Sequence, residues 1–148
     1  VNSTQTTLAD QLTAAGADIV VGNHPHVIQP FQWVNNKPVF YAMGNLISTQ
    51  LNQENLVGLC AGLDITKKED GSIVIDNVKA DLMYTTMEGT YPALRYNLQV
   101  HPMKNVSDET LQAQQCNKDY TTVNELYEAS KAIVTSLDSN ITIGGIFE

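Results

Sequence analysis

The feature that most constrains the fold is an unbroken apolar run placed directly after a helical segment. Apolar residues recur at helical spacing within residues 7–15, and Gly16 follows where a helix would end. Residues 18–22, Asp-Ile-Val-Val-Gly, then predict a short strand buried on both faces, as in a parallel sheet. A helix that leads into such a strand is the second half of a β-α-β unit. We therefore expect the chain to begin within an α/β domain.

The middle of the chain predicts antiparallel strands. The clusters Asn35-Asn36-Lys37 and Asp70-Gly71 are typical of hairpin turns. Alternating apolar residues around and beyond these turns predict strands at residues 31–34, 38–43, 57–65, 73–78, 80–85 and 93–100.

The last part of the chain returns to helix. Ser107 is a good N-cap for a helix over residues 108–116. Thr122 and Glu125 form a capping-box pattern at the start of a second helix, which extends to about residue 137.

Length and charge limit which class of protein this can be and which partners it can bind. We expect one α/β (α+β) region over residues 1–148, with a helical tail over 106–148. There are 16 acidic residues against 8 scattered basic ones, for a net charge of -8, so nucleic-acid binding is not expected. No apolar window is long enough for a membrane span in this chain.

Cys60 and Cys116 fit no metal or redox spacing, which leaves a disulfide or two buried free thiols open.

The densest chemical pattern is the hexapeptide at residues 22–27, Gly-Asn-His-Pro-His-Val, directly after the predicted strand. Ligands of open α/β sheets bind beyond the carboxyl ends of strands. Two imidazoles separated by one residue in an extended segment project to the same side, so His24 and His26 could bind one metal ion or two neighbouring ones. Further ligands must then come from elsewhere. The alternative is that both are ordinary loop histidines bonded to the backbone.

Other residues are weaker candidates. We expect His101 to be structural or exposed, and Glu69 and Asp70 to belong to a turn. Three carboxylates on or beside predicted strands are expected to face solvent: Asp64, Asp76 and Asp81. Four aromatic residues of the first hairpin could line a groove for a polymer, but packing over the sheet is favoured: Phe31, Trp33, Phe40 and Tyr41.

Two blocks of the sequence resemble the C-terminal signature of the CapA family, residues 17–29 (ADIVVGNHPHVIQ) and residues 37–47 (KPVFYAMGNLI). These are bacterial capsule or poly-γ-glutamate synthesis proteins with a metallophosphoesterase-like fold. The resemblance covers residues 8–47. It implies that the chain is the C-terminal part of a metallophosphoesterase-like β-sandwich flanked by helices.

The resemblance also assigns roles to three residues. His24 and His26 match late ligands of a site that holds divalent metal ions, two in related phosphoesterases. Asn45 matches a family landmark, which makes it a candidate catalytic residue, either loop-bracing or on the substrate side; a turn-capping role is the alternative. The family's earlier motifs would lie upstream of Val1. We therefore expect a missing N-terminal half of the same domain to complete the site.

The function implied is capsule or poly-γ-glutamate biosynthesis, outside the cytoplasm or at the cell surface. In the full-length protein this would be a metal-dependent hydrolase or transferase. An anionic cell-surface polymer would have to be held through metal, because a net charge of -8 repels it. One alternative is a non-catalytic accessory or polymer-binding protein that keeps the fold as a scaffold. Another is a small β-rich module with terminal helices, for which the likeness is fortuitous.

Overall fold

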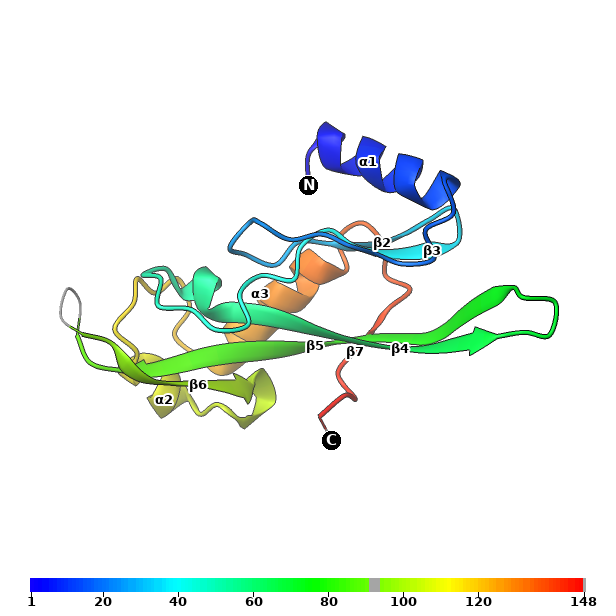
Figure 1. Ribbon diagram of the computed structural model, residues 1–148. Helices are drawn as coiled ribbons and strands as arrows, with labels where there is room; N and C mark the ends of the chain where they lie inside the picture. Colours follow the sequence, from blue (N-terminus) through cyan, green and yellow to red (C-terminus); the bar gives the residue numbers. More distant parts are fainter. Residues whose placement is uncertain (91–93, 148) are drawn as a thin grey trace.

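A computed structural model describes residues 1–90 and 94–147 as an α+β fold with two sheets, which confirms the expected class. The smaller sheet has the order β1-β3-β2, and the larger has the order β4-β5-β6, with β7 paired to β5. Figure 1 shows α1 over the smaller sheet and the long β4–β5 ribbon beneath it. The helices are α1 (Ser3–Ala14), α2 (Asp108–Ala113) and α3 (Val123–Val134), with short 3₁₀ helices η1 (Gln53–Leu56) and η2 (Met103–Asn105). The strands are β1 (Val20–Val21), β2 (Phe31–Val34), β3 (Lys37–Phe40), β4 (Val57–Lys67), β5 (Ile73–Glu88), β6 (Tyr96–Pro102) and β7 (Thr142–Ile143).

The first helix and strand form near their predicted positions, but the helix begins at Ser3 rather than at residue 7, and the strand covers only Val20–Val21 of the predicted residues 18–22. The helix α1 begins at a capping box, in which Asn2 and Gln5 exchange side-chain to backbone hydrogen bonds. The strand β1 pairs in parallel with β3, with Val20 opposite Val39. However, Val21 is 60% exposed, so the prediction of a strand buried on both faces is wrong. The physical reason is that β1 lies at the edge of its sheet.

The hairpin of β2 and β3 has a two-residue turn. Asn35 and Asn36 both have positive φ, 50° and 58°, which is the conformation of a type I′ turn. Lys37 therefore belongs to β3, where it pairs with Val34, and not to the turn. The second strand of the pair ends at Phe40 rather than at residue 43.

The long ribbon of β4 and β5 corrects the strand count. Residues 73–78 and 80–85, predicted as two strands, form the single strand β5. Asn77 has a φ of 53° and lies at a β-bulge, where the register of the two strands shifts. In the sequence, this bulge interrupts the strand pattern in the same way as a break between two strands. The strand predicted at 93–100 is β6 (Tyr96–Pro102); its first predicted residue, Ala93, lies outside the described residues.

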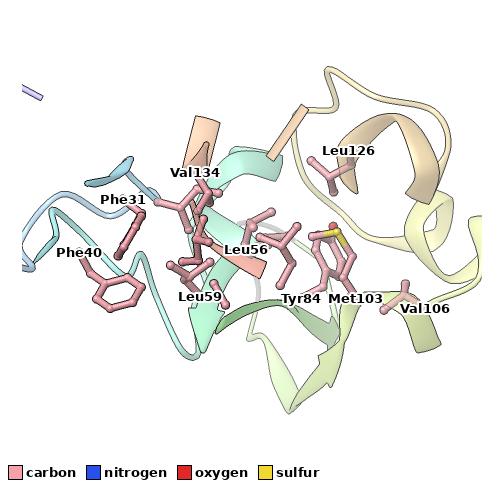
Figure 2. Packing of buried hydrophobic residues seen from close by; sticks show 14 of the residues in the cluster. Phe31, Phe40, Leu56, Leu59, Tyr84, Met103, Val106, Leu126 and Val134 are labelled. Carbon is pink, nitrogen blue, oxygen red and sulfur yellow. The ribbon is translucent and has the colours of Figure 1, made fainter. Parts of the chain in front are cut away.

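The main core lies between the larger sheet and the C-terminal helices. Figure 2 shows Leu56, Tyr84 and Leu126 meeting in this core, with Phe31 and Phe40 of the hairpin at one end. The helices α2 and α3 begin at the predicted caps, and each ends three residues earlier than expected. Among the described residues, no helix is long and apolar enough to cross a membrane.

Asp81 is the clearest error of the sequence-based burial prediction. Its side chain is 3% exposed, whereas Asp64 and Asp76 are exposed as expected. One carboxylate oxygen accepts from the backbone N–H of Leu82, and the other from those of Ile146 and Phe147, at 3.3 and 3.4 Å. This buried carboxylate therefore holds the C-terminal segment against β5 beside β7, a strand that the sequence did not predict.

The cap of α3 makes a testable contribution to acid stability. The carboxylate of Glu125 accepts hydrogen bonds from Thr121 and Thr122, which lower its pKa from the usual 4.5. Because the pKa is lower in the folded chain, this contribution is present above about pH 4.5 and is lost as pH falls through the folded value. Glu125→Gln should flatten the acid decline of the unfolding free energy, measured by urea denaturation across this range. Glu128→Gln, on the same helix but outside the cap, is the control for the removal of one carboxylate.

Candidate functional site

The candidate site lies where two neighbouring strands of the smaller sheet end. The loop of residues 22–27 follows β1, and the loop of residues 44–50 follows β3 after a short connection. Because β1 and β3 run in parallel, their carboxyl ends lie at the same edge of the sheet. The structure thus brings together the two sequence blocks that carry the family resemblance.

Two glycines permit each of these loops to pack closely against neighbouring backbone. A Cβ atom on Gly22 would lie 2.2 Å from the carbonyl oxygen of Tyr41. A Cβ atom on Gly44, which has a φ of +67°, would lie 2.7 Å from the carbonyl oxygen of Val57. A side chain at Gly22 would meet the backbone of Tyr41, and one at Gly44 would meet the backbone of Val57, so either would push its loop away from the segment it packs against.

Asn45 connects the two loops through its side-chain amide. Its Nδ2 donates to the backbone oxygens of His26 and Asn55, at 3.3 and 3.0 Å, and lies near the side-chain oxygens of Ser48 and Gln50. Its Oδ1 lies 2.8 Å from Nδ1 of His26. Asn45 therefore braces the site, as the loop-bracing alternative predicted; a role in a reaction stays a prediction.

This network defines the protonation of His26. Backbone carbonyl oxygens can only accept, so the Asn45 atom that faces two of them must be the NH₂ group. The opposite atom is then the carbonyl oxygen, and Nδ1 of His26 must carry the proton that it accepts. The neutral ring consequently presents an unprotonated Nε2. This is how a histidine is prepared to bind a metal ion through one nitrogen.

His24 reaches the same cleft by a different backbone path. Its φ is 102°, so the extended segment assumed for the two histidines is not what the structure shows. The backbone N–H of His24 donates to Oδ1 of Asn23, at 2.9 Å, which helps to hold this uncommon conformation. Both histidines are exposed, and both line an open cleft of about 360 Å³ together with Asn45.

The donor set fits part of a metal site. Two imidazoles in one cleft, one of them with a free Nε2 set by a hydrogen bond, suit a divalent transition metal ion. Within residues 1–90 and 94–147, no group of three or more His, Cys, Asp and Glu side chains could hold a metal ion. His24 and His26 alone would not complete a metal site, and their role as metal ligands stays a prediction.

Sequence reasoning missed the residues that support His26. Asn55 donates its Nδ2 to the backbone oxygen of His26, at 2.9 Å, and lies 29 positions away. Ser48 and Gln50 lie close to Asn45 in sequence but belong to no pattern that marks them. The one available signal was their position directly after the second block of the resemblance.

The weaker candidates take structural roles. Nε2 of His101 lies 2.9 Å from the hydroxyl of Thr86 on the neighbouring strand. The carboxylate of Asp70 accepts from Ser72 within the hairpin turn, which lowers its pKa. Cys60 and Cys116 are both free thiols, and burial raises the pKa of each. The hairpin aromatics pack as favoured, with three buried and one partly exposed: Phe31, Phe40, Tyr41 and Trp33.

Comparisons with known proteins agree with the resemblance over the same part of the chain. Residues 1–50 match the family described as bacterial capsule synthesis protein PGA_cap. This part of the chain is similar to proteins of the CapA family. The PGA biosynthesis protein CapA of Bacillus subtilis (strain 168) is 45% identical over 49 residues, and the capsule biosynthesis protein CapA of Bacillus anthracis is 46% identical over 46 residues.

The match to these relatives is local. It covers 33% of this chain and 13% of the B. subtilis protein, and 31% of this chain and 11% of the B. anthracis protein. No solved structure matches the chain significantly. The matched segment nevertheless includes both loops of the site, because residues 1–50 contain His24, His26 and Asn45.

The amide of Asn45 should control which nitrogen of His26 carries the proton. In the parent chain the neutral ring should be the Nδ1–H tautomer, observed by long-range proton–nitrogen NMR correlations at about pH 8.5, above the usual histidine pKa. In Asn45→Ala the acceptor is lost, so the Nε2–H tautomer should become populated. His101, which has its own partner, is the internal control. A parent chain with the proton on Nε2 of His26 would contradict the assignment.

Gly22 should be intolerant of any side chain. We expect Gly22→Ala to lower the unfolding free energy by about 2–4 kcal/mol, because the new Cβ overlaps a backbone oxygen that cannot move freely. Gly71→Ala is the matched control. Its φ is +86° but no atom lies within 4 Å of its Cβ, so it should cost about 1 kcal/mol. Equal costs in denaturant unfolding would show that close packing at Gly22 is unimportant.

Proposed function

We propose that His24 and His26 supply part of a divalent-metal site in a metallophosphoesterase-like domain that acts in capsule or poly-γ-glutamate biosynthesis. The reaction would be hydrolysis or transfer at a phosphoryl or amide-type centre. The observation that carries the proposal is the hydrogen bond from Nδ1 of His26 to Asn45, which leaves Nε2 free at an open cleft. An N-terminal half of the same domain would provide the other ligands.

Each residue of the site has a distinct role in this proposal. His26 binds metal through Nε2, and His24 is the second imidazole of the cleft. Asn45 acts as a positioning residue, since it fixes the ring of His26 and braces both loops. Such supporting hydrogen bonds orient a ligand and raise its basicity, and losing one typically weakens metal affinity by about 10- to 100-fold.

A metal ion at this cleft would also explain how an anionic substrate can bind to a negatively charged chain. A bound divalent ion polarises a phosphoryl or carbonyl oxygen and lowers the pKa of bound water. The chain carries a net charge of -8, which repels an anionic cell-surface polymer such as poly-γ-glutamate. Binding of the polymer therefore requires cations at the point of contact, and a metal held by the two histidines supplies them. An extracytoplasmic or cell-surface location follows from this role.

The names of the relatives support the biological setting of the proposal. They describe biosynthesis of PGA and of capsule, and their similarity to this chain lies in the segment that contains the site. The matched segment spans about an eighth of those proteins. We therefore expect the activity to depend on further residues outside this segment.

Metal analysis of histidine variants tests the site. The intact protein, purified without chelator, should hold bound divalent metal when measured by plasma mass spectrometry. His24→Ala and His26→Ala should each lower the metal content at least by half. Asn45→Ala should retain binding at high metal concentration but weaken its affinity by about 10- to 100-fold.

His101→Ala is the matched control, because His101 lies outside the cleft and should leave metal content unchanged. A parent protein without stoichiometric metal, whose activity in any assay is insensitive to both histidine substitutions, would refute the metal site. That result would favour the non-catalytic accessory or polymer-binding protein instead.

A further inference from the structure

The smaller sheet has one edge that no described strand covers. Its strand order is β1-β3-β2, so β3 lies on one side of β1, and within residues 1–90 and 94–147 no strand pairs with the other side. The N–H of Gly22 donates to the backbone oxygen of Phe40, at 2.7 Å, on the β3 side. Because the backbone groups of successive residues in a strand point to opposite edges, the N–H and C=O of Val21 face the free edge. This edge therefore offers a hydrogen-bond donor and an acceptor to another strand.

Apart from its short length, this edge lacks the features that usually protect an exposed strand. Residues 19–22, Ile-Val-Val-Gly, include no proline and no charged side chain. The nearest charge, on Asp18, is paired with Lys37 of β3. Val21 is 60% exposed. Natural proteins usually blunt a free edge with lysine, proline or a covering segment, so an apolar edge of this kind is typical of a strand that pairs with another part of the protein.

The helix α1 has an apolar flank on the side of β1. Ala9 is buried against the sheet. On one side of Ala9, the carboxylate of Asp10 accepts a hydrogen bond from Asn35 in the turn between β2 and β3. A helix turns by about 100° per residue, so Leu8 and Leu12 lie on the opposite flank, away from that turn.

This flank borders a groove of about 150 Å³ between α1 and the sheet. Leu8 and Leu12 form its helical side, and Val20, Gly22 and Asn23 line it from β1 and the loop that follows. Leu8 is 52% exposed and Leu12 is 40% exposed. The helix thus carries apolar side chains suited to a wider sheet than the described strands provide.

We propose that the N-terminal half of the domain docks here by adding a parallel strand to the free edge of β1. The helix α1 leads into β1, and in a β-α-β unit the strand before the helix runs parallel to the strand after it and usually lies beside it. Since β3 occupies one side of β1, the added strand takes the other. Its backbone pairs with Val21, and its apolar side chains cover Leu8 and Leu12.

The size of the relatives supports this occupant. The matched segments are 13% and 11% of the two CapA proteins, so most of each relative lies outside the segment that this chain resembles. A parallel strand at this edge would end beside the loop of residues 22–27, and docking would bring further side chains to the cleft of His24 and His26. The inference rests on the N-terminal half expected in the proposed function, but not on metal binding.

Amide hydrogen exchange at Val21 tests the docking. In the 148-residue chain alone, the N–H of Val21 should exchange at close to the rate of an unprotected amide. In the intact protein it should exchange at least about 100-fold more slowly, because it donates to the added strand. Mass spectrometry with residue resolution measures both rates. The N–H of Gly22, which already donates to Phe40, should be protected in both samples and is the internal control.

Two variants test the edge and the groove separately. Val21→Pro removes an N–H that β3 does not use, so it should lower the unfolding midpoint of the intact protein by about 2–4 °C more than that of the 148-residue chain. Leu8→Gln keeps a similar helix propensity and should show the same difference. Ile133→Gln is the matched control, because Ile133 is a 44% exposed residue of α3, and it should shift both midpoints equally.

Two results would overturn the proposal: fast exchange of Val21 in the intact protein, or equal midpoint shifts of both proteins for Val21→Pro and Leu8→Gln. Protection of Val21 that grows with the concentration of the 148-residue chain would place a second copy at this edge instead. Metal content is a separate measurement. An intact protein with a protected Val21 and no metal would refute the metal site alone, and one with metal and an unprotected Val21 would refute the docking alone.

Discussion

The contact between Gly44 and Gly58 joins the two sheets of the protein. These residues form an antiparallel bridge, and next to it the N–H of Leu59 donates to the backbone oxygen of Met43 at 2.8 Å. A Cβ on Gly58 would lie 2.3 Å from the carbonyl oxygen of Asn45, so the approach depends on the absence of side chains. Through this contact, the hairpin aromatics join the main core, and the loop that carries Asn45 is held in place.

The same contact explains why the candidate site is preorganised. Asn45 uses its NH₂ group on backbone oxygens from both sides of the site and its carbonyl oxygen on His26. A ligand whose ring is already oriented loses less entropy when it binds a metal ion. Asn55, at the end of η1, holds the carbonyl of His26 from the side of the larger sheet. The ring of His26 is thus held by Asn45 and its backbone by Asn55, which lies beyond the first 50 residues that match the family.

Local sequence patterns predicted the parts of the fold that local interactions stabilise. The caps at Ser107 and Thr122 form as predicted, and the turn predicted at residues 35–37 forms at Asn35-Asn36, because each depends on residues within four positions of one another. The continuity of β5 was missed, because a bulge at Asn77 leaves the same polar break in the sequence as a turn. Burial of Asp81 was missed because its partners lie 65 and 66 positions away.

The sequence by itself determined which residues are candidates for the site. His24, His26 and Asn45 all stand in short motifs with a recognisable spacing. Only the tertiary structure decided how they are arranged and held. The protonated nitrogen of His26 depends on an amide 19 positions away, and its backbone oxygen is held by Asn55, 29 positions away. Spacing in sequence reports on which groups are present, whereas the direction of a hydrogen bond and the lining of a cavity depend on contacts between distant segments.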